Sequence, residues 1–153
     1  MEKLQAHLEA KLHRAISVFI FNSNKELLLQ KRAMGKYHSA GLWTNTCCSH
    51  PKPDEKTTDA AQRRLQEEMG ISCHLQPVFN FTYLAKLENG ITEHEFDHVF
   101  FGFTDDLPKL NKEEASDYKY VPLAEIETWL QESPEQFTVW FKLIFDRVKK
   151  EIK

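Results

Sequence analysis

The chain has 153 residues, of which 41% are hydrophobic, 28% charged and 12% aromatic, a composition that fits one folded domain and excludes a disordered chain. Its 20 basic and 23 acidic residues leave a net charge of -3, with no general attraction to nucleic acid or anionic membranes. There is neither a long apolar run nor the apolar core of a signal peptide. We therefore expect a cytoplasmic protein in which residues 1–153 form a single domain, as a monomer or weak homodimer.

The cysteines are poorly suited to structural disulfides. There are three, Cys47, Cys48 and Cys73, and two of them are adjacent in the sequence. An odd number with this spacing, in a chain without a secretion signal, favours free thiols.

The first predicted elements form a β-hairpin. Residues 14–21 are rich in β-branched and aromatic types, residues 22–25 read as a turn, and residues 26–30 form a second apolar run. From residue 31 to 54 the periodicity disappears, while glycine, proline and polar residues accumulate. So long a connection without secondary structure is usually functional, and we expect the site to include it.

A helix follows this connection. Thr57 or Thr58 can cap its start, and apolar residues recur every four positions from Ala61 to Met69. Gly70 then provides the usual C-terminal stop of a helix.

The second half of the chain combines strands with later helices. Two long strand-like runs flank a hairpin turn at residues 88–90, and a short strand, a helix opened by Pro122 and a final helix follow. Their predicted ranges are 72–84, 91–103, 118–121, 122–130 and 135–148. This order predicts a mixed β-sheet combined with helices.

Two glutamates on one of these strands are candidate metal ligands. Glu93 and Glu95 lie two residues apart, so their carboxylates share one face of the strand, roughly 7 Å apart, while His94 points the other way. The alternative is an ordinary solvated strand face. Neighbouring apolar residues such as Phe96 and Phe100 suggest a central strand, where unpaired carboxylates are unfavourable. This favours a functional role.

Three histidines are scattered through the first third of the chain. His7 and His13 are six residues apart and would lie on different faces of a continuous helix, so they meet only if the chain bends. His50 follows Cys48 by two residues in the long connection. Taken separately, each is better explained as an ordinary surface histidine than as a metal ligand.

Residues 49–71 match a longer pattern. A Nudix box has nine defined positions, and seven of the nine match here. The residues at these positions are Ser49, Glu55, Arg63, Arg64, Leu65, Glu67, Glu68, Gly70 and Ile71. The segment resembles a Nudix loop–helix–loop, in which carboxylates hold a divalent cation against a diphosphate. Ser49 replaces a glycine, and Arg64 replaces a glutamate that holds metals in Nudix hydrolases. The second departure argues against hydrolysis.

Outside this segment the sequence resembles one Nudix-fold branch that carries these departures, the type 1 isopentenyl-diphosphate isomerases. The matching features are the cysteine motif Gly41–Pro51, the glutamate motif Glu93–Glu95, the phosphate-binding segment Gln30–Ala33 with Lys36, and the aromatic residues Tyr83 and Trp140. The resemblance runs from about Lys3 to the last helix. It implies a Nudix-type α/β/α sandwich with a mixed β-sheet.

The resemblance also implies two metal cofactors. One divalent metal, Mn²⁺, Zn²⁺ or Mg²⁺, has the implied ligands His7, His13, His50, Glu93 and Glu95. A Mg²⁺ ion bound with the diphosphate has the implied ligand Glu68.

The implied reaction interconverts isopentenyl and dimethylallyl diphosphates, with a small-molecule diphosphate as the partner of the protein. Cys48 and Glu95 would be the acid–base pair, and the Tyr83 hydroxyl would orient Glu95. The implied substrate-binding residues are Lys3, Arg32, Lys36, Arg64 and Trp140. Two other functions remain open at this stage, a Nudix diphosphate hydrolase and a catalytically silent diphosphate-binding module.

Overall fold

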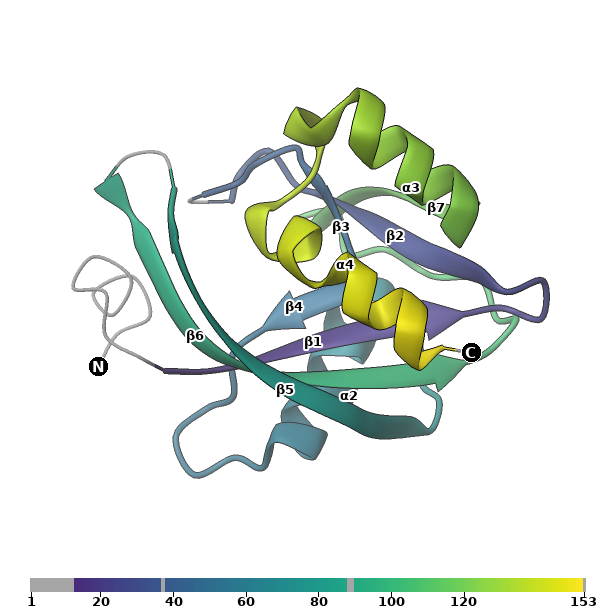
Figure 1. Cartoon of the computed structure of the whole chain (residues 1–153). Helices are drawn as coiled ribbons and strands as arrows, with labels where there is room; N and C mark the ends of the chain where they lie inside the picture. Colours follow the sequence, from purple (N-terminus) through teal and green to yellow (C-terminus); the bar gives the residue numbers. More distant parts are fainter. Residues whose placement is uncertain (1–12, 37, 88–89, 153) are drawn as a thin grey trace.

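A computed structural model of the chain describes residues 13–36, 38–87 and 90–152 (Figure 1). The elements in chain order are β1 His13–Phe21, β2 Glu26–Arg32, β3 Trp43–Thr44, β4 Cys47–Ser49, α2 Thr57–Met69, β5 Leu75–Lys86, β6 Thr92–Phe103, β7 Ala115–Pro122, α3 Leu123–Glu132, the 3₁₀ turn η2 Pro134–Gln136, and α4 Val139–Glu151.

The strands form one mixed, seven-stranded sheet. Its main path is β3-β2-β1-β6-β5, with β4 paired to β1 and β7 paired to β2. β1 runs parallel to β6 and antiparallel to β4. β1 and β2 pair at Phe21 and Leu27, beside the predicted hairpin turn, and β2 then pairs with β7 along its length. The two strands of the hairpin therefore separate and belong to different parts of the sheet.

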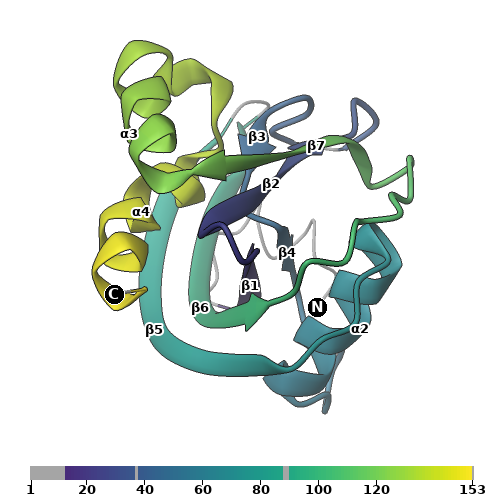
Figure 2. The same cartoon turned by 90° about the vertical axis from the view of Figure 1, so that its right-hand side faces the viewer.

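Helices cover both faces of this sheet, with α2 on one side and α4 on the other (Figure 2). Phe19 and Phe21 of β1 join the apolar cluster under α4, whereas Val18 and Ile20 join the cluster under α2. Because β1 is buried on both faces, its sequence is continuously apolar. Each such side chain contributes about 1.5–3 kcal/mol on burial. The predicted α/β/α sandwich is confirmed.

Polar residues fill the space where β1 and β2 separate. The Thr46 hydroxyl accepts a hydrogen bond from Ile20 N and donates to Leu28 O, and Asn45 Nδ2 donates to Val18 O. These buried side chains satisfy main-chain groups that the separated strands do not pair. The expected loop 31–54 therefore contains two short strands, β3 and β4, and the prediction that it lacks secondary structure is wrong.

Helix α2 begins and ends by different means. The residue at its N-cap is Lys56, without a side-chain cap, so the prediction of a Thr57 or Thr58 cap is wrong. Its C-cap is Gly70, as predicted, with φ of 66°. A β-carbon on Gly70 would lie 2.7 Å from Lys109 O, so glycine also allows the segment before β7 to approach the end of α2.

Helix α4 starts later than the sequence suggests. It begins at Val139 rather than near Glu135, because η2 precedes it and Thr138 takes the N-cap position. The Thr138 side chain accepts a hydrogen bond from Phe141 N. β5 is displaced from the predicted 72–84, and β7 is longer than the predicted 118–121. No helix within the described ranges has the length and apolar character needed to cross a bilayer.

Candidate active site

A cavity of about 30 Å³, here called the inner pocket, is lined by β1, β4, β6 and the start of α4. The predicted site residues that line it are Arg32, Cys48, His50, Tyr83, Glu93, Glu95 and Trp140. This volume holds about one water molecule, so a five-carbon group can enter only if the side chains around it move.

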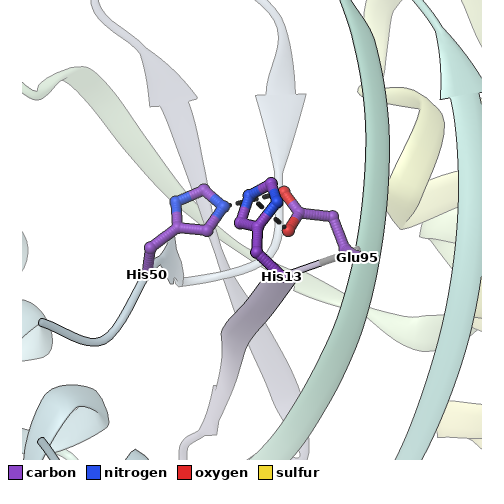
Figure 3. Close-up of side chains that lie close together, drawn as sticks. All are labelled: His13, His50 and Glu95. Atoms are coloured by element: carbon purple, nitrogen blue, oxygen red, sulfur yellow. Dashed lines mark hydrogen bonds and ion pairs between the residues drawn. The ribbon is translucent and has the colours of Figure 1, made fainter. Parts of the chain in front are cut away.

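Two histidines meet the Glu95 carboxylate at one end of the inner pocket (Figure 3). The parallel register of β1 and β6 places His13 directly opposite Glu95, and His50 follows the end of β4. His13 Nε2 lies 2.9 Å from Glu95 Oε2, and His50 Nε2 lies 2.7 Å from Glu95 Oε1. The ligand atoms of these three residues all lie within 4.8 Å of one another.

The donor set of this cluster fits a divalent metal ion. The Glu95 side chain is 1% exposed, and a carboxylate so deeply buried needs a compensating cation. Two imidazole nitrogens and a carboxylate oxygen are ligands that zinc, manganese and magnesium share to different degrees. Of the five implied ligands, the structure brings together His13, His50 and Glu95, while His7 lies outside the described residues.

Glu93 lies on the same buried face of β6 but has different neighbours. Its Oε1 accepts a hydrogen bond of 3.3 Å from the Tyr83 hydroxyl, and its Oε2 lies 3.4 Å from His38 Nε2. Tyr83 is opposite Glu95 in the β5–β6 register, yet its hydroxyl donates to Glu93. The Tyr83 hydroxyl thus contacts Glu93 in this structure, and its role in orienting Glu95 stays a prediction.

The structure separates the two adjacent cysteines. Strand alternation along β4 buries Cys47 in the apolar cluster beneath α2 and turns Cys48 toward the inner pocket. Cys48 Sγ donates to Asn45 Oδ1 and accepts from Trp140 Nε1, each at 2.9 Å. Burial, together with the charge of Asp97, raises the pKa of Cys48 to about 12. The thiol therefore keeps its proton at neutral pH.

Trp140 lies where β4, the segment around Arg32 and α4 approach one another. Its indole N–H donates a hydrogen bond to Cys48 Sγ, and the Arg32 guanidinium carbon lies 5.2 Å from the centroid of its ring. The indole ring is therefore part of the wall of the inner pocket, and its N–H is bonded to the thiol, while its contact with the substrate stays a prediction.

Asp97 is a site residue that the sequence interpretation missed. It continues the alternation of Glu93 and Glu95 on β6, is 2% exposed, and lines the inner pocket. Its Oδ2 accepts a 2.6 Å hydrogen bond from the Ser17 hydroxyl. Burial raises the pKa of Asp97 to about 8, with the charges of the two glutamates adding to the effect and the Ser17 bond opposing it. Extending the two-residue period by one step would have found it.

A second cavity, of about 300 Å³ and here called the outer pocket, adjoins the first. Arg32, Cys48 and Ser49 line both cavities. The other residues that line the outer pocket are Gly35, Lys36, Arg64, Glu68, Glu113 and Glu114. It thus collects three predicted substrate-binding cations and the predicted Mg²⁺ ligand, whereas Lys3 lies outside the described residues.

Carboxylates pair with two of the three cations of the outer pocket, Lys36 and Arg64. Arg64 Nη2 lies 2.6 Å from Glu68 Oε2 and 2.7 Å from Glu114 Oε2. Although burial opposes it, pairing with Lys36 and Arg64 lowers the pKa of Glu114 to about 2. Gln30 Nε2 donates to Glu68 Oε1 and fixes that side chain from β2. Glu114, in the segment before β7, was not predicted and has no motif to mark it.

Comparison with known proteins agrees with this arrangement. A NUDIX domain family model matches residues 11–141, so the chain belongs to the NUDIX domain family. The crystal structure of a MutT protein from Methanosarcina mazei Go1 shares the fold, with a TM-score of 0.78, 23% identity, and coverage of 95% of this chain and 98% of that one.

Relatives of higher identity define the branch. An isopentenyl-diphosphate Delta-isomerase from Pectobacterium atrosepticum is 57% identical and spans 97% of this chain and 83% of its own. Isopentenyl-diphosphate Delta-isomerase 1 from Aromatoleum aromaticum is 56% identical, spanning 95% of this chain and 82% of its own. Within the NUDIX family, the chain therefore belongs to the isopentenyl-diphosphate Delta-isomerase family, which confirms the resemblance inferred from its motifs.

Proposed function

We propose that this protein interconverts isopentenyl diphosphate and dimethylallyl diphosphate. The observation that carries the proposal is the placing of a thiol, Cys48, and a carboxylate, Glu95, on two strands that flank β1 and line one cavity. Relatives up to 57% identical are named for this reaction. The adjoining outer pocket supplies cations for a diphosphate.

The reaction adds one proton to the substrate and removes another. A proton adds to the terminal alkene carbon, positive charge develops on the adjacent tertiary carbon, and a proton leaves the carbon on its other side. No atoms are otherwise gained or lost, so a donor and an acceptor on different sides of the substrate suffice. Cys48 and Glu95 have these roles. One turnover leaves the donor without its proton and the acceptor with an added one, so exchange with solvent must restore both groups before the next turnover.

The surroundings of Cys48 suit proton exchange. Its raised pKa keeps the thiol protonated, and the indole N–H of Trp140 already points at the sulfur, where it would stabilise a transient thiolate. The face of the same indole can attract a cationic carbon by about 1–2 kcal/mol in a desolvated pocket. Trp140 therefore serves both the thiol and the substrate.

His13, His50 and Glu95 would hold the divalent metal, with Glu93 and His7 as the further ligands that the family resemblance implies. When bound, this ion compensates the buried carboxylates and biases the protonation of Glu95. Mn²⁺, Zn²⁺ and Mg²⁺ are the candidate ions. The chain's own contribution is to fix Glu95 between two strands, where it faces the alkene.

The outer pocket would bind the diphosphate. Arg32, Lys36 and Arg64 provide positive charge, and a guanidinium can bind two phosphate oxygens at once. Glu68 would hold a Mg²⁺ ion together with the phosphate oxygens. Arg64 then explains the departure from the hydrolase pattern, because it replaces a metal-binding carboxylate by a substrate contact.

The test is incubation of the protein with isopentenyl diphosphate, Mg²⁺ and Mn²⁺ in heavy water. We expect dimethylallyl diphosphate with deuterium on carbon and no released phosphate, because the added proton comes from groups that exchange with solvent. Phosphate release without carbon-bound deuterium would instead identify a hydrolase, and binding without either product would identify a silent binding module.

A further inference from the structure

The Glu114 carboxylate forms ion pairs with two of the cations that we expect to bind the diphosphate. Its Oε2 contacts Lys36 Nζ at 2.5 Å and Arg64 Nη2 at 2.7 Å, so one carboxylate oxygen engages two of the three cations of the outer pocket. Phosphate oxygens seek the same charged N–H donors. Within the described structure, Glu114 therefore takes the position of an anionic ligand.

The backbone around Glu114 fixes this arrangement. Lys109 N donates to Met69 O, and Asn111 N donates to Glu68 O, which attaches the segment before β7 to the end of α2. Glu114 N then donates to Asn111 O. The Glu114 side chain is thus held opposite Arg64 and is only 24% exposed, which distinguishes it from a freely solvated surface carboxylate.

The charges of the outer pocket are nearly balanced without a ligand. Its three cations, Arg32, Lys36 and Arg64, face the carboxylates of Glu68 and Glu114, and the exposed Glu113 adds a third carboxylate whose charge is screened by solvent. A free diphosphate ester carries roughly three negative charges at pH 7. Bound Mg²⁺ cancels two of them. A nearly balanced pocket therefore leaves most of the charge of a free diphosphate uncompensated, whereas the smaller charge of the magnesium complex needs little compensation.

We propose that Glu114 is a specificity-determining residue, which competes with metal-free diphosphate for Lys36 and Arg64 and so makes binding depend on the magnesium complex. The inference rests on the diphosphate substrate of the proposed function. It assigns Glu114 a role that a purely structural ion pair would not have, because it predicts a change in ligand preference rather than in stability alone.

The test is calorimetric titration of the full chain with inorganic pyrophosphate, in buffer without Mg²⁺ and in buffer with excess Mg²⁺. For Glu114→Gln we expect metal-free pyrophosphate to bind about tenfold more tightly, since its competitor loses its charge. Binding of magnesium pyrophosphate should change by less than about threefold. The preference for the magnesium complex therefore shrinks.

Glu113→Gln is the matched control, because Glu113 lines the same cavity and is exposed, and no ion pair recorded for the described residues joins it to Lys36 or Arg64. It should leave the preference unchanged. Thermal unfolding of each variant checks folding, and Glu114→Asp, which keeps the charge, should preserve the preference even if Glu114→Gln folds poorly.

An unchanged magnesium preference in a folded Glu114→Gln protein would overturn the inference. So would a tenfold loss of magnesium pyrophosphate binding, which would make Glu114 a ligand rather than a competitor. Failure of the heavy-water experiment contradicts the isomerase reaction alone, because pyrophosphate binding is measured without turnover.

Discussion

The inner and outer pockets share residues but balance their charges differently. In the inner pocket, β6 places three carboxyl groups on one buried face, beside imidazoles, a hydroxyl and a thiol. In the outer pocket, each cation that contacts Glu114 is 18% exposed and paired with a carboxylate. Burial raises the pKa of Cys48 and of Asp97, so both hold their protons near neutral pH, whereas ion pairs near solvent can exchange partners with a ligand. The inner pocket is therefore suited to proton transfer, and the outer pocket to binding an anion.

The largest effect should come from the thiol that both pockets share. Cys48→Ala removes a proton-transfer group, so turnover should fall by about 100- to 10,000-fold in the deuterium assay while pyrophosphate binding persists. Cys47→Ala is the control, because Cys47 lies in the cluster beneath α2; it should reduce stability by about 1 kcal/mol and leave turnover largely intact. An inactive Cys47→Ala protein beside an active Cys48→Ala protein would reverse our assignment of the two cysteines.

The second test separates the metal cluster from the rest of β6. His50→Ala removes one of the imidazoles that contact Glu95, so metal content after dialysis should fall at least about tenfold, and strong chelation should inactivate the parent protein. His98→Ala is the control: His98 lies on β6 with its side chain on the face away from Glu95. Elemental analysis measures the metal content of both variants. Full activity in a metal-free protein would refute the cluster as a metal site.

The third test addresses the outer pocket. Arg64→Glu replaces a cation by an anion, so magnesium pyrophosphate should bind with about 1.5–3 kcal/mol less free energy, which is roughly a 10- to 100-fold loss. Arg63→Glu makes the same charge change one residue away, where the side chain pairs with Glu55 and Glu67 instead of lining the pocket. Calorimetry compares the affinities of the two variants for magnesium pyrophosphate. Equal losses would show that general charge, rather than the Arg64 contact, determines binding.

Arg64→Glu also tests why the chain departs from the hydrolase pattern. It restores a carboxylate at that position, yet one added carboxylate does not position an attacking water. We therefore expect no efficient release of phosphate, which a phosphate assay can check. Efficient hydrolysis by this variant would mean that the pocket is already organised for attack at phosphorus.

Sequence motifs predicted much of the site because they record local spacing. The two-residue period of Glu93 and Glu95 correctly placed both carboxylates on one buried face. The Nudix box also identified Arg64 and Glu68 as site residues, and both line the outer pocket. Such relations depend on the helical and strand periods alone, which sequence spacing determines directly.

Relations between distant segments were harder to predict. The pairing of His13 with Glu95 follows from a parallel β1–β6 register, which no local pattern sets. Glu114 reaches Arg64 only because the segment before β7 attaches to the end of α2. The buried Asn45 and Thr46 bridge strands whose separation the hairpin pattern did not suggest. Tertiary contacts decide these positions, so their chemistry became visible only in the fold.

The smallest effect concerns a Nudix-box position that lines neither pocket. Glu55 accepts 2.9 Å hydrogen bonds from Nε and Nη2 of Arg63 and one from Lys52 N. The Arg63 bonds, followed by the Lys52 bond, lower the pKa of Glu55 from 4.5 to about 2. A lowered pKa stabilises the folded protein above the unfolded value, and the stabilisation is lost as pH falls from about 4.5 through about 2.

Glu55→Gln should therefore reduce the free energy of unfolding slightly at pH 6, and the difference from the parent protein should disappear as the pH approaches 2. Urea unfolding at a series of pH values measures this difference. Metal content and pyrophosphate affinity should not change, because the Glu55 pair is formed with Arg63 and the adjoining loop rather than with either pocket. A fall in pyrophosphate affinity would show that Glu55 contributes to binding, and that the binding region extends beyond the residues that line the outer pocket.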